Sequence, residues 1–266
     1  MDINAIRAKL DALNNSGQER EKTDYSKIFW KPQLGKQTVR IVPSAFDPTF
    51  PFKELKFHYG IGKFPMVSLS NFGKQDPIEE FVKELRKTND KDNWSLSGKI
   101  NPKTRVFAPV VVRGEEDKGV RLWGFGVTIY KALLALAEDE DIGDFTDVLN
   151  GWDMVVEQVQ GNPYPETTVR IKPKQTPLSD NNDLVDTWLK DQPNPTEVHT
   201  QYDYEYIKKQ LQNYLDPGSA DDSTPATPAT DKLPESLGQQ KADFTLETAT
   251  AGNKDTVSKF DDLFNE

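Results

Sequence analysis

Residues 94–131 read WSLSGKINPKTRVFAPVVVRGEEDKGVRLWGFGVTIYK, and the fold prediction starts from them. Two runs rich in β-branched and aromatic residues, 105–113 and 120–128, flank a polar turn that begins and ends with Gly114 and Gly119. Runs of this kind on either side of a glycine-containing turn predict a β-hairpin. The stretch holds seven Lys and Arg residues against three acidic residues, net +4, whereas the whole chain carries net −10.

Aromatic residues are interspersed with cations in this predicted hairpin. Trp94, Phe107, Trp123 and Phe125 lie among its Lys and Arg residues. Bases stack on aromatic rings while cations contact phosphates, so this mixture is typical of a surface that binds single strands. The alternative is that the rings belong to the hydrophobic core and the charges to a solvated face, as is common in strands. The hairpin alone leaves both interpretations open.

The composition limits the classes of protein to which the chain can belong. It has no cysteine, which excludes disulfides and zinc sites with cysteine ligands. No apolar run approaches the ~20 residues of a membrane span and no signal peptide opens the chain, so we expect a cytoplasmic protein. With two histidines and no glycine-rich phosphate loop, the sequence gives no case for an enzyme or for a cofactor.

Acidic residues are concentrated at the C-terminal end. Residues 217–266 hold ten Asp and Glu residues against four Lys residues, net −6, in a stretch without hydrophobic periodicity. This composition predicts a disordered acidic tail. The tail ends in an apolar group among acids, which predicts a motif that recruits other proteins, and the alternative is a merely solubilising tail. The residues of the predicted motif are Phe260, Asp261, Asp262, Leu263 and Phe264.

The N-terminal end predicts a short amphipathic helix over residues 2–14, with Ile3, Ile6 and Leu10 on one stripe. A short helix behind a polar linker cannot bury its stripe alone, so it docks either on its own core or on another molecule. We therefore divide the chain into an arm for self-association over residues 1–20, a folded core over 21–216 and the tail over 217–266.

The core is predicted to be mainly β with flanking helices, which is an α+β class. Besides the hairpin, strands are expected over residues 28–30, 37–42, 52–59, 64–69, 152–159 and 167–172. Helices are expected over residues 77–87, 129–136 and 202–215. Short strands separated by Gly and Pro corners are typical of a small barrel or sandwich.

The order of these segments resembles the single-stranded DNA-binding, or helix-destabilising, proteins of T-even-type bacteriophages. The resemblance covers residues 27–215 and is carried by QTVRIVPS at 37–44, FKELKFH at 52–58, KTRVFAPVVV at 103–112, VRLWGFG at 120–126 and GNPYP at 161–165, with FDDLF at 260–264 beyond them. It implies an OB-fold-like barrel core that binds single-stranded DNA without strong sequence preference. It also implies an arm for cooperative self-association and a tail that recruits proteins of DNA replication, recombination and repair.

The resemblance also implies site residues. Arg40 matches a phosphate-contacting arginine, and Trp94 matches a cleft aromatic only loosely, because the loop before it differs in length. Arg113 and Arg121 of the hairpin are added to the residues predicted to contact phosphates. The predicted DNA-binding residues are Trp94, Phe107, Trp123 and Tyr164 for stacking, and Arg40, Lys103, Arg105, Arg113 and Arg121 for phosphates.

One departure concerns metal. The family often carries a zinc subdomain with one His and three Cys. Here His58 stands at the histidine position, while Ser68 or Leu69, Asp76 and Glu79 stand at the cysteine positions. An Asp/Glu/His site is chemically possible, but without thiolates we expect no structural zinc. The expected replacement is apolar packing around Phe64, Leu69, Phe72 and Phe81.

Two other functions stay open from the sequence. An OB-type RNA-binding protein would use the same cations and rings and would differ in contacts to the 2′-hydroxyl. A scaffold that does not bind nucleic acid would use only the arm and the tail, both of which are predicted to dock proteins.

Overall fold

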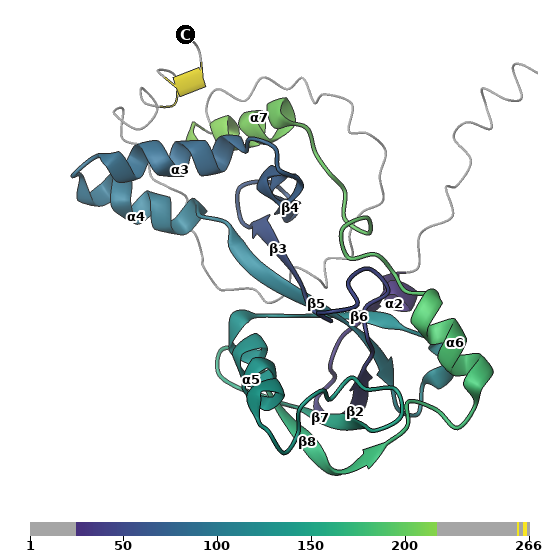
Figure 1. The fold of residues 1–266 in the computed structure, drawn as a ribbon. Coiled ribbons are helices and arrows are strands. Elements are labelled where there is room, and N and C mark those ends of the chain that lie inside the picture. Colours follow the sequence, from purple (N-terminus) through teal and green to yellow (C-terminus); the bar gives the residue numbers. More distant parts are fainter. Residues whose placement is uncertain (1–24, 217–259, 261–262, 265–266) are drawn as a thin grey trace, which may run out of the picture.

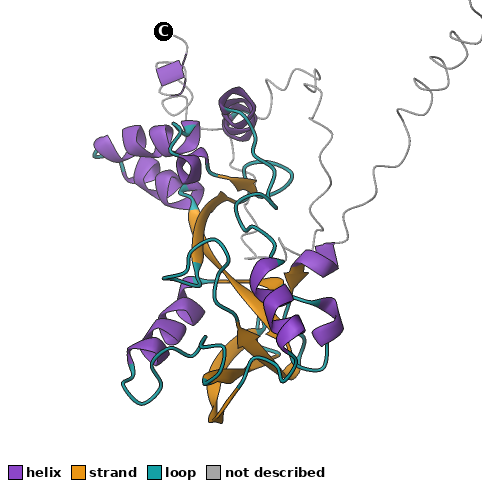
Figure 2. Ribbon diagram, turned by 45° about the vertical axis from the view of Figure 1, so that its right-hand side comes forward, coloured by secondary structure: helices purple, strands orange, loops and turns teal. Residues whose placement is uncertain are grey.

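The computed structural model describes residues 25–216 together with Phe260, Leu263 and Phe264. The predicted arm over residues 1–20, with Ile3, Ile6 and Leu10, lies outside the described residues, as do residues 217–259, Asp261 and Asp262. Figure 1 shows most strands gathered at one end of the molecule and a group of helices at the other, with two strands running between them. Figure 2 shows the same division from a second side.

The described part of the chain contains eight strands in one sheet. They are β1 (Phe29–Trp30), β2 (Gly35–Ile41), β3 (Lys53–His58), β4 (Met66–Val67), β5 (Lys103–Val112), β6 (Arg121–Phe125), β7 (Gly151–Val159) and β8 (Glu166–Thr176). The strand order is β1-β6-β5-β2-β7-β8, and β3 pairs with both β4 and β5. The described helices are α2 (Tyr25–Ile28), α3 (Pro77–Lys87), α4 (Lys91–Ile100), α5 (Val127–Glu138), α6 (Asn182–Lys190) and α7 (Tyr204–Leu215).

This topology confirms the α+β class but not a closed barrel. Strands β1 and β8 stand at the two ends of the strand order, and the described residues do not pair them with each other. The sheet is therefore open between these two edges.

The predicted hairpin is confirmed as β5 and β6, which pair antiparallel from Val106 opposite Phe125 to Val110 opposite Arg121. On its other side, β5 changes partner along its length. Its first half pairs with β3 and its last residues with β2. Pro109 falls at this change of partner, where it has no N–H to donate, and its carbonyl accepts a hydrogen bond from the Val42 amide.

Both faces of β5 are covered by apolar side chains. Val106, Ala108 and Val110 belong to the main core, which also contains Trp123 and is covered by α5. On the opposite face, Phe107 belongs to a smaller cluster with residues of β1 and β3. Residues 106–112 are all buried in consequence. A strand covered on both faces reads as a continuous apolar run, as this one does.

The helical end of the molecule has a core of its own. Helix α3 matches the predicted residues 77–87, because Asp76 caps its first turn, Pro77 occupies the first helical position, and an apolar stripe faces inward. That stripe packs against Ile207, Leu211 and Leu215 of α7, which begins at Tyr204. None of the described helices has the length and apolar character that crossing a bilayer requires.

Besides the four-residue α2, two helices were not predicted. Helix α4 lies between the predicted helix over residues 77–87 and the hairpin, and Asp90 caps its first turn. Helix α6 begins after Asn181, whose side chain accepts hydrogen bonds from two backbone amides of the first turn. Each of these two helices begins after a typical N-cap residue, Asp90 or Asn181, and this sequence signal could have predicted both of them.

Candidate nucleic-acid interface

The structure places two of the predicted stacking residues inside the core. Trp123 is 1% exposed and Phe107 is 2% exposed. The Trp123 ring packs 5.5 Å from that of Trp30 and 4.6 Å from that of Phe125, centroid to centroid. Phe107 lies over Gly124 on the neighbouring strand, where an added Cβ would come within 2.9 Å of its ring. A ring covered in this way offers no face to a base, so the prediction that these two residues stack on DNA is corrected: they support the fold.

Two of the predicted phosphate contacts form a buried ionic group instead. Arg40 is 0% exposed, and its Nε lies 3.3 Å from Oδ1 of Asp153. Arg113 binds the same carboxylate through two nitrogens, with Nη2 2.9 Å from Oδ1 and Nε 3.2 Å from Oδ2. Burial lowers the pKa of Arg40, while Asp153 acts in the opposite direction. Because both guanidinium groups are bound to Asp153 within the protein, they serve the fold, and their predicted contacts with phosphates are corrected.

Arg121 is also engaged within the protein. It is buried on β6, and its Nη2 donates a hydrogen bond of 2.6 Å to the Glu115 carboxylate in the hairpin turn. The hydrogen bonds from Arg121 and Lys118 lower the pKa of Glu115. Arg121 therefore ties the turn to the strand, which corrects its predicted contact with phosphate.

The remaining predicted cations are accessible. Lys103 is exposed at the start of β5, and Arg105 is half-buried two residues further on. Residues two apart on a strand point to the same face, so the two cations lie side by side. The Arg105 Nη2 donates to the Gly124 carbonyl at 3.3 Å, and the Lys103 Nζ donates to the Gly98 carbonyl at 3.3 Å. Neither contact uses a carboxylate.

Two residues that sequence reasoning missed lie close to Arg105. Lys31 is exposed overall, but the partial burial of its ammonium group lowers its pKa. The positive charge of Arg105 lowers this pKa further. Burial also raises the pKa of Tyr59, which the charge of Arg105 opposes, and the ring remains 36% exposed. We call Lys31, Tyr59, Lys103 and Arg105 the basic face. The positive charge of Arg105 acts on both Lys31 and Tyr59, so cations and an aromatic ring lie close together here, an arrangement that suits an anionic ligand.

The other two predicted aromatic residues are accessible but lie on separate elements. Trp94 projects from α4 and is 64% exposed. It stands one helical turn before Gly98, whose carbonyl holds Lys103. Tyr164 is half-buried in the turn between β7 and β8. Helix α4 leads directly into β5, on which the basic face begins, and Figure 1 shows the β7–β8 pair at the other end of β5.

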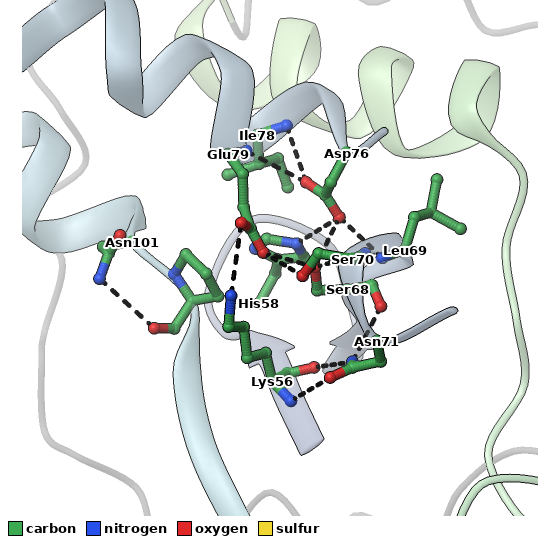
Figure 3. A network of polar contacts seen from close by, with 11 residues as sticks. Lys56, His58, Ser68, Leu69, Ser70, Asn71, Asp76, Ile78, Glu79 and Asn101 are labelled. Carbon is green, nitrogen blue, oxygen red and sulfur yellow. Dashed lines mark hydrogen bonds and ion pairs between the residues drawn. The ribbon is translucent and has the colours of Figure 1, made fainter. Parts of the chain in front are cut away.

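The positions expected to replace a zinc site form a hydrogen-bonded network (Figure 3). His58 Nε2 lies 2.9 Å from Oδ2 of Asp76, and the same oxygen accepts hydrogen bonds from the Ser68 hydroxyl and the Leu69 amide. Glu79 accepts from the Ser68 hydroxyl at 2.8 Å and lies 3.5 Å from Lys56. Burial alone would raise the pKa of Asp76, but the hydrogen bonds and the charge of His58 lower it overall.

These residues do not fit a metal ion. Their donor atoms are hydrogen-bonded to one another, and no thiolate is present. Within residues 25–216 no group of three or more His, Asp or Glu side chains is placed to hold a metal. Of the predicted apolar replacements, Leu69 and Phe81 belong to the core of the helical end, whereas Phe72 packs against the cluster around Phe107.

His199 packs against Phe107 and is 5% exposed. Its ring packs against Phe57, Phe107 and Phe29 at 5.0, 5.2 and 5.6 Å between centroids. Neither ring nitrogen has a hydrogen-bond partner among the described residues. Burial among these rings lowers the pKa of His199 to about 4, so the imidazole is neutral at pH 7.

His199 should make the stability of the fold depend on pH. Between pH 6.5 and about 4 the unfolded chain binds a proton at His199 that the folded chain does not, so the free energy of unfolding falls as the pH is lowered through this window. The loss attributable to His199 should reach about 3 kcal/mol at pH 4. Urea unfolding at several pH values should show that His199→Leu removes this part of the slope. Parallel profiles for both proteins would contradict the assignment.

The comparisons with known proteins can now be set beside this geometry. The sequence model of a family described as gp32 DNA binding protein like matches residues 33–214. The matched residues include all strands from β2 to β8 and helices α3 to α6, and they end within α7. A search of curated proteins found no match.

Proposed function

Because the chain belongs to the family of gp32-like DNA-binding proteins, we propose that it binds single-stranded DNA through the basic face and the neighbouring Trp94. The family match supports DNA as the ligand. The geometry supports the location, because this is where accessible cations and accessible aromatic rings lie together. The matched family is one of DNA-binding proteins rather than an enzyme class.

The basic face supplies both contacts that single strands require. Lys31, Lys103 and Arg105 provide positive charge for the phosphates, since Lys31 and Lys103 are exposed and Arg105 is half-buried beside them. Tyr59 and Trp94 provide exposed rings on which bases stack. These contacts read no base edge, so binding should have little sequence preference. Tyr164 contributes to the same surface only if a long single strand of DNA runs along β5 as far as the β7–β8 turn.

The wider organisation belongs to the same proposal. The sheet is an OB-like core, open between β1 and β8, over residues 21–216. Residues 1–20 act as an arm that contacts the next molecule along the strand, which makes binding cooperative. Residues 217–266 act as an acidic tail that recruits proteins of phage DNA replication, recombination and repair. The apolar stripe of the arm and the aromatic end of the tail support these two roles.

Substitution of Trp94 tests the location of the site. Trp94→Ala should weaken binding to a short oligo-dT by about 1–3 kcal/mol, because it removes one stacking platform. Lys103→Ala should instead reduce the slope of affinity against salt by about one unit, because it removes one phosphate contact. Both side chains are exposed, so the melting temperature should not change. Fluorescence anisotropy at several salt concentrations measures both effects.

The matched control is Leu149→Ala, which removes an exposed apolar side chain that is neither aromatic nor charged. Its affinity for oligo-dT should equal that of the unaltered protein. Equal affinity of all three variants would place the site elsewhere. Tighter binding to the RNA oligomer of the same length would favour an RNA-binding protein, since only RNA offers the 2′-hydroxyl.

A further inference from the structure

The C-terminal tip of the chain returns to the helical end of the molecule. Phe260 is 2% exposed and belongs to the same core cluster as Phe81 of α3 and Leu215 of α7. Its ring centroid lies 6.0 Å from that of Phe81, with the two planes at 75°. This edge-to-face arrangement is one that aromatic pairs prefer in protein cores. Phe260 is therefore packed as a core residue although it lies six positions before the last residue of the sequence.

A second aromatic residue fixes the tip on the surface of α7. The Phe264 ring lies 4.8 Å from that of Phe260 and 6.4 Å from that of Tyr204. Lys208 holds it twice, with Nζ 5.1 Å from the ring centroid and a hydrogen bond of 2.9 Å to the Phe264 carbonyl. Leu263, between the two anchors, remains 36% exposed. The contacts are thus those of a short peptide with two aromatic anchors seated on a preformed face.

We propose that the face formed by α3 and α7 is a docking site for an aromatic, acidic peptide, and that its resident occupant is the C-terminal tip of the same chain. The occupant is identified by its contacts, since Phe260 and Phe264 fill the site. Its chemistry agrees with the face, because the Lys208 ammonium contacts both the ring and the carbonyl of Phe264. The peptide is acidic by its sequence, which includes Asp261, Asp262 and Glu266.

The docked tip is unavailable to other proteins. A partner that binds Phe260 must bury the same ring that α3 and α7 already bury, so the tip has two exclusive states. The intramolecular state is favoured by the tether, because a linked peptide faces its site at an effective concentration on the order of millimolar. The apparent affinity of any partner for the tip is then reduced by the fraction of chains in which the tip is free.

This arrangement goes beyond the recruitment role proposed above and does not require DNA. The docking site lies on α3 and α7, whereas the basic face lies on β5 and the residues beside it. A protein that fails to bind DNA could still dock its tip, and the reverse also holds. The two proposals can therefore fail separately.

The absence of cysteine allows a direct test in the full-length chain. Asn265→Cys provides a single attachment point for a nitroxide spin label at the tip. In ¹⁵N-labelled protein without DNA, the label should broaden the backbone amide signals around Phe81, Tyr204 and Lys208. In a mixture of ¹⁵N-labelled chains without the spin label and unlabelled chains that carry it, the same signals should stay sharp, because docking is within one chain.

A substitution at the anchor completes the test. Phe260→Ala should abolish the broadening while the amide signals of β5 keep their positions. Phe244→Ala, the same change elsewhere in the tail sequence, should leave the broadening intact. The proposal is overturned if the signals of α3 and α7 are never broadened, if Phe260→Ala leaves them broadened, or if broadening occurs only in the mixed sample.

Discussion

Trp123→Ala should lower the free energy of unfolding by about 3–5 kcal/mol, the loss typical of truncating a large aromatic side chain in a core. The ring is almost fully buried and packs against Trp30 and Phe125, so its removal leaves a cavity on the inner face of β6. Such a loss is a large fraction of the stability of an ordinary domain. Urea denaturation followed by circular dichroism measures it.

Trp94→Ala is the matched control, since it is the same substitution at an exposed tryptophan. It should change the free energy of unfolding by less than about 0.5 kcal/mol. Trp123→Ala should therefore change stability, whereas Trp94→Ala should change the affinity for DNA. A stable Trp123→Ala protein with greatly reduced affinity for oligo-dT would return Trp123 to the interface and contradict its assignment to the core.

Asp153→Asn should be comparably destabilising, by about 3–5 kcal/mol. The substitution removes the negative charge shared by Arg40 and Arg113 and leaves the Arg40 guanidinium buried without its ion pair. Arg40 is 0% exposed and packs closely against Gly151, where a Cβ would come within 2.7 Å of Nη1. The measurement is again denaturant unfolding, at pH 7 where carboxylates are ionised.

Asp186→Asn removes the same charge from a solvent-exposed pair, in which Asp186 lies 3.6 Å from Lys190 on α6. Its cost should not exceed about 0.5 kcal/mol, as for other exposed pairs one helical turn apart. If Asp153→Asn were no more costly than this control, the group around Arg40 would not be a structural element, and its role in binding phosphates would have to be reconsidered.

The elements of the fold could largely be predicted because their signals are local. The hairpin was evident from two β-rich runs around a glycine-bounded turn, and α3 from its proline and its apolar stripe. The boundaries of β7 and β8 were predicted to within one to four residues. Barrel closure was not predicted correctly, because it depends on whether β1 meets β8, two strands far apart in the sequence.

The candidate site was harder to predict because burial is decided by distant segments. The run from Val106 to Val112 is continuously apolar, which indicates a strand covered on both faces and should have placed Phe107 in the core. The ion pairs of Asp153 with Arg40 and Arg113 join residues 40 or more positions apart, and no local pattern announces them. Lys31 and Tyr59 were missed for the same reason, since only the fold brings them to Arg105.

The free edge of β8 has a consequence for how copies of the protein can lie next to one another. Among the described strands, β8 pairs only with β7. The N–H and C=O groups along its other edge therefore form no ladder and can pair with a strand of another molecule. Lys172, Pro173 and Lys174 stand opposite the irregularity in the β7–β8 register between Trp152 and Met154. A proline, two lysines and a bulge are the devices by which natural sheets prevent edge-to-edge polymerisation. Molecules crowded on one strand of DNA can therefore be close neighbours without fusing their sheets into an aggregate.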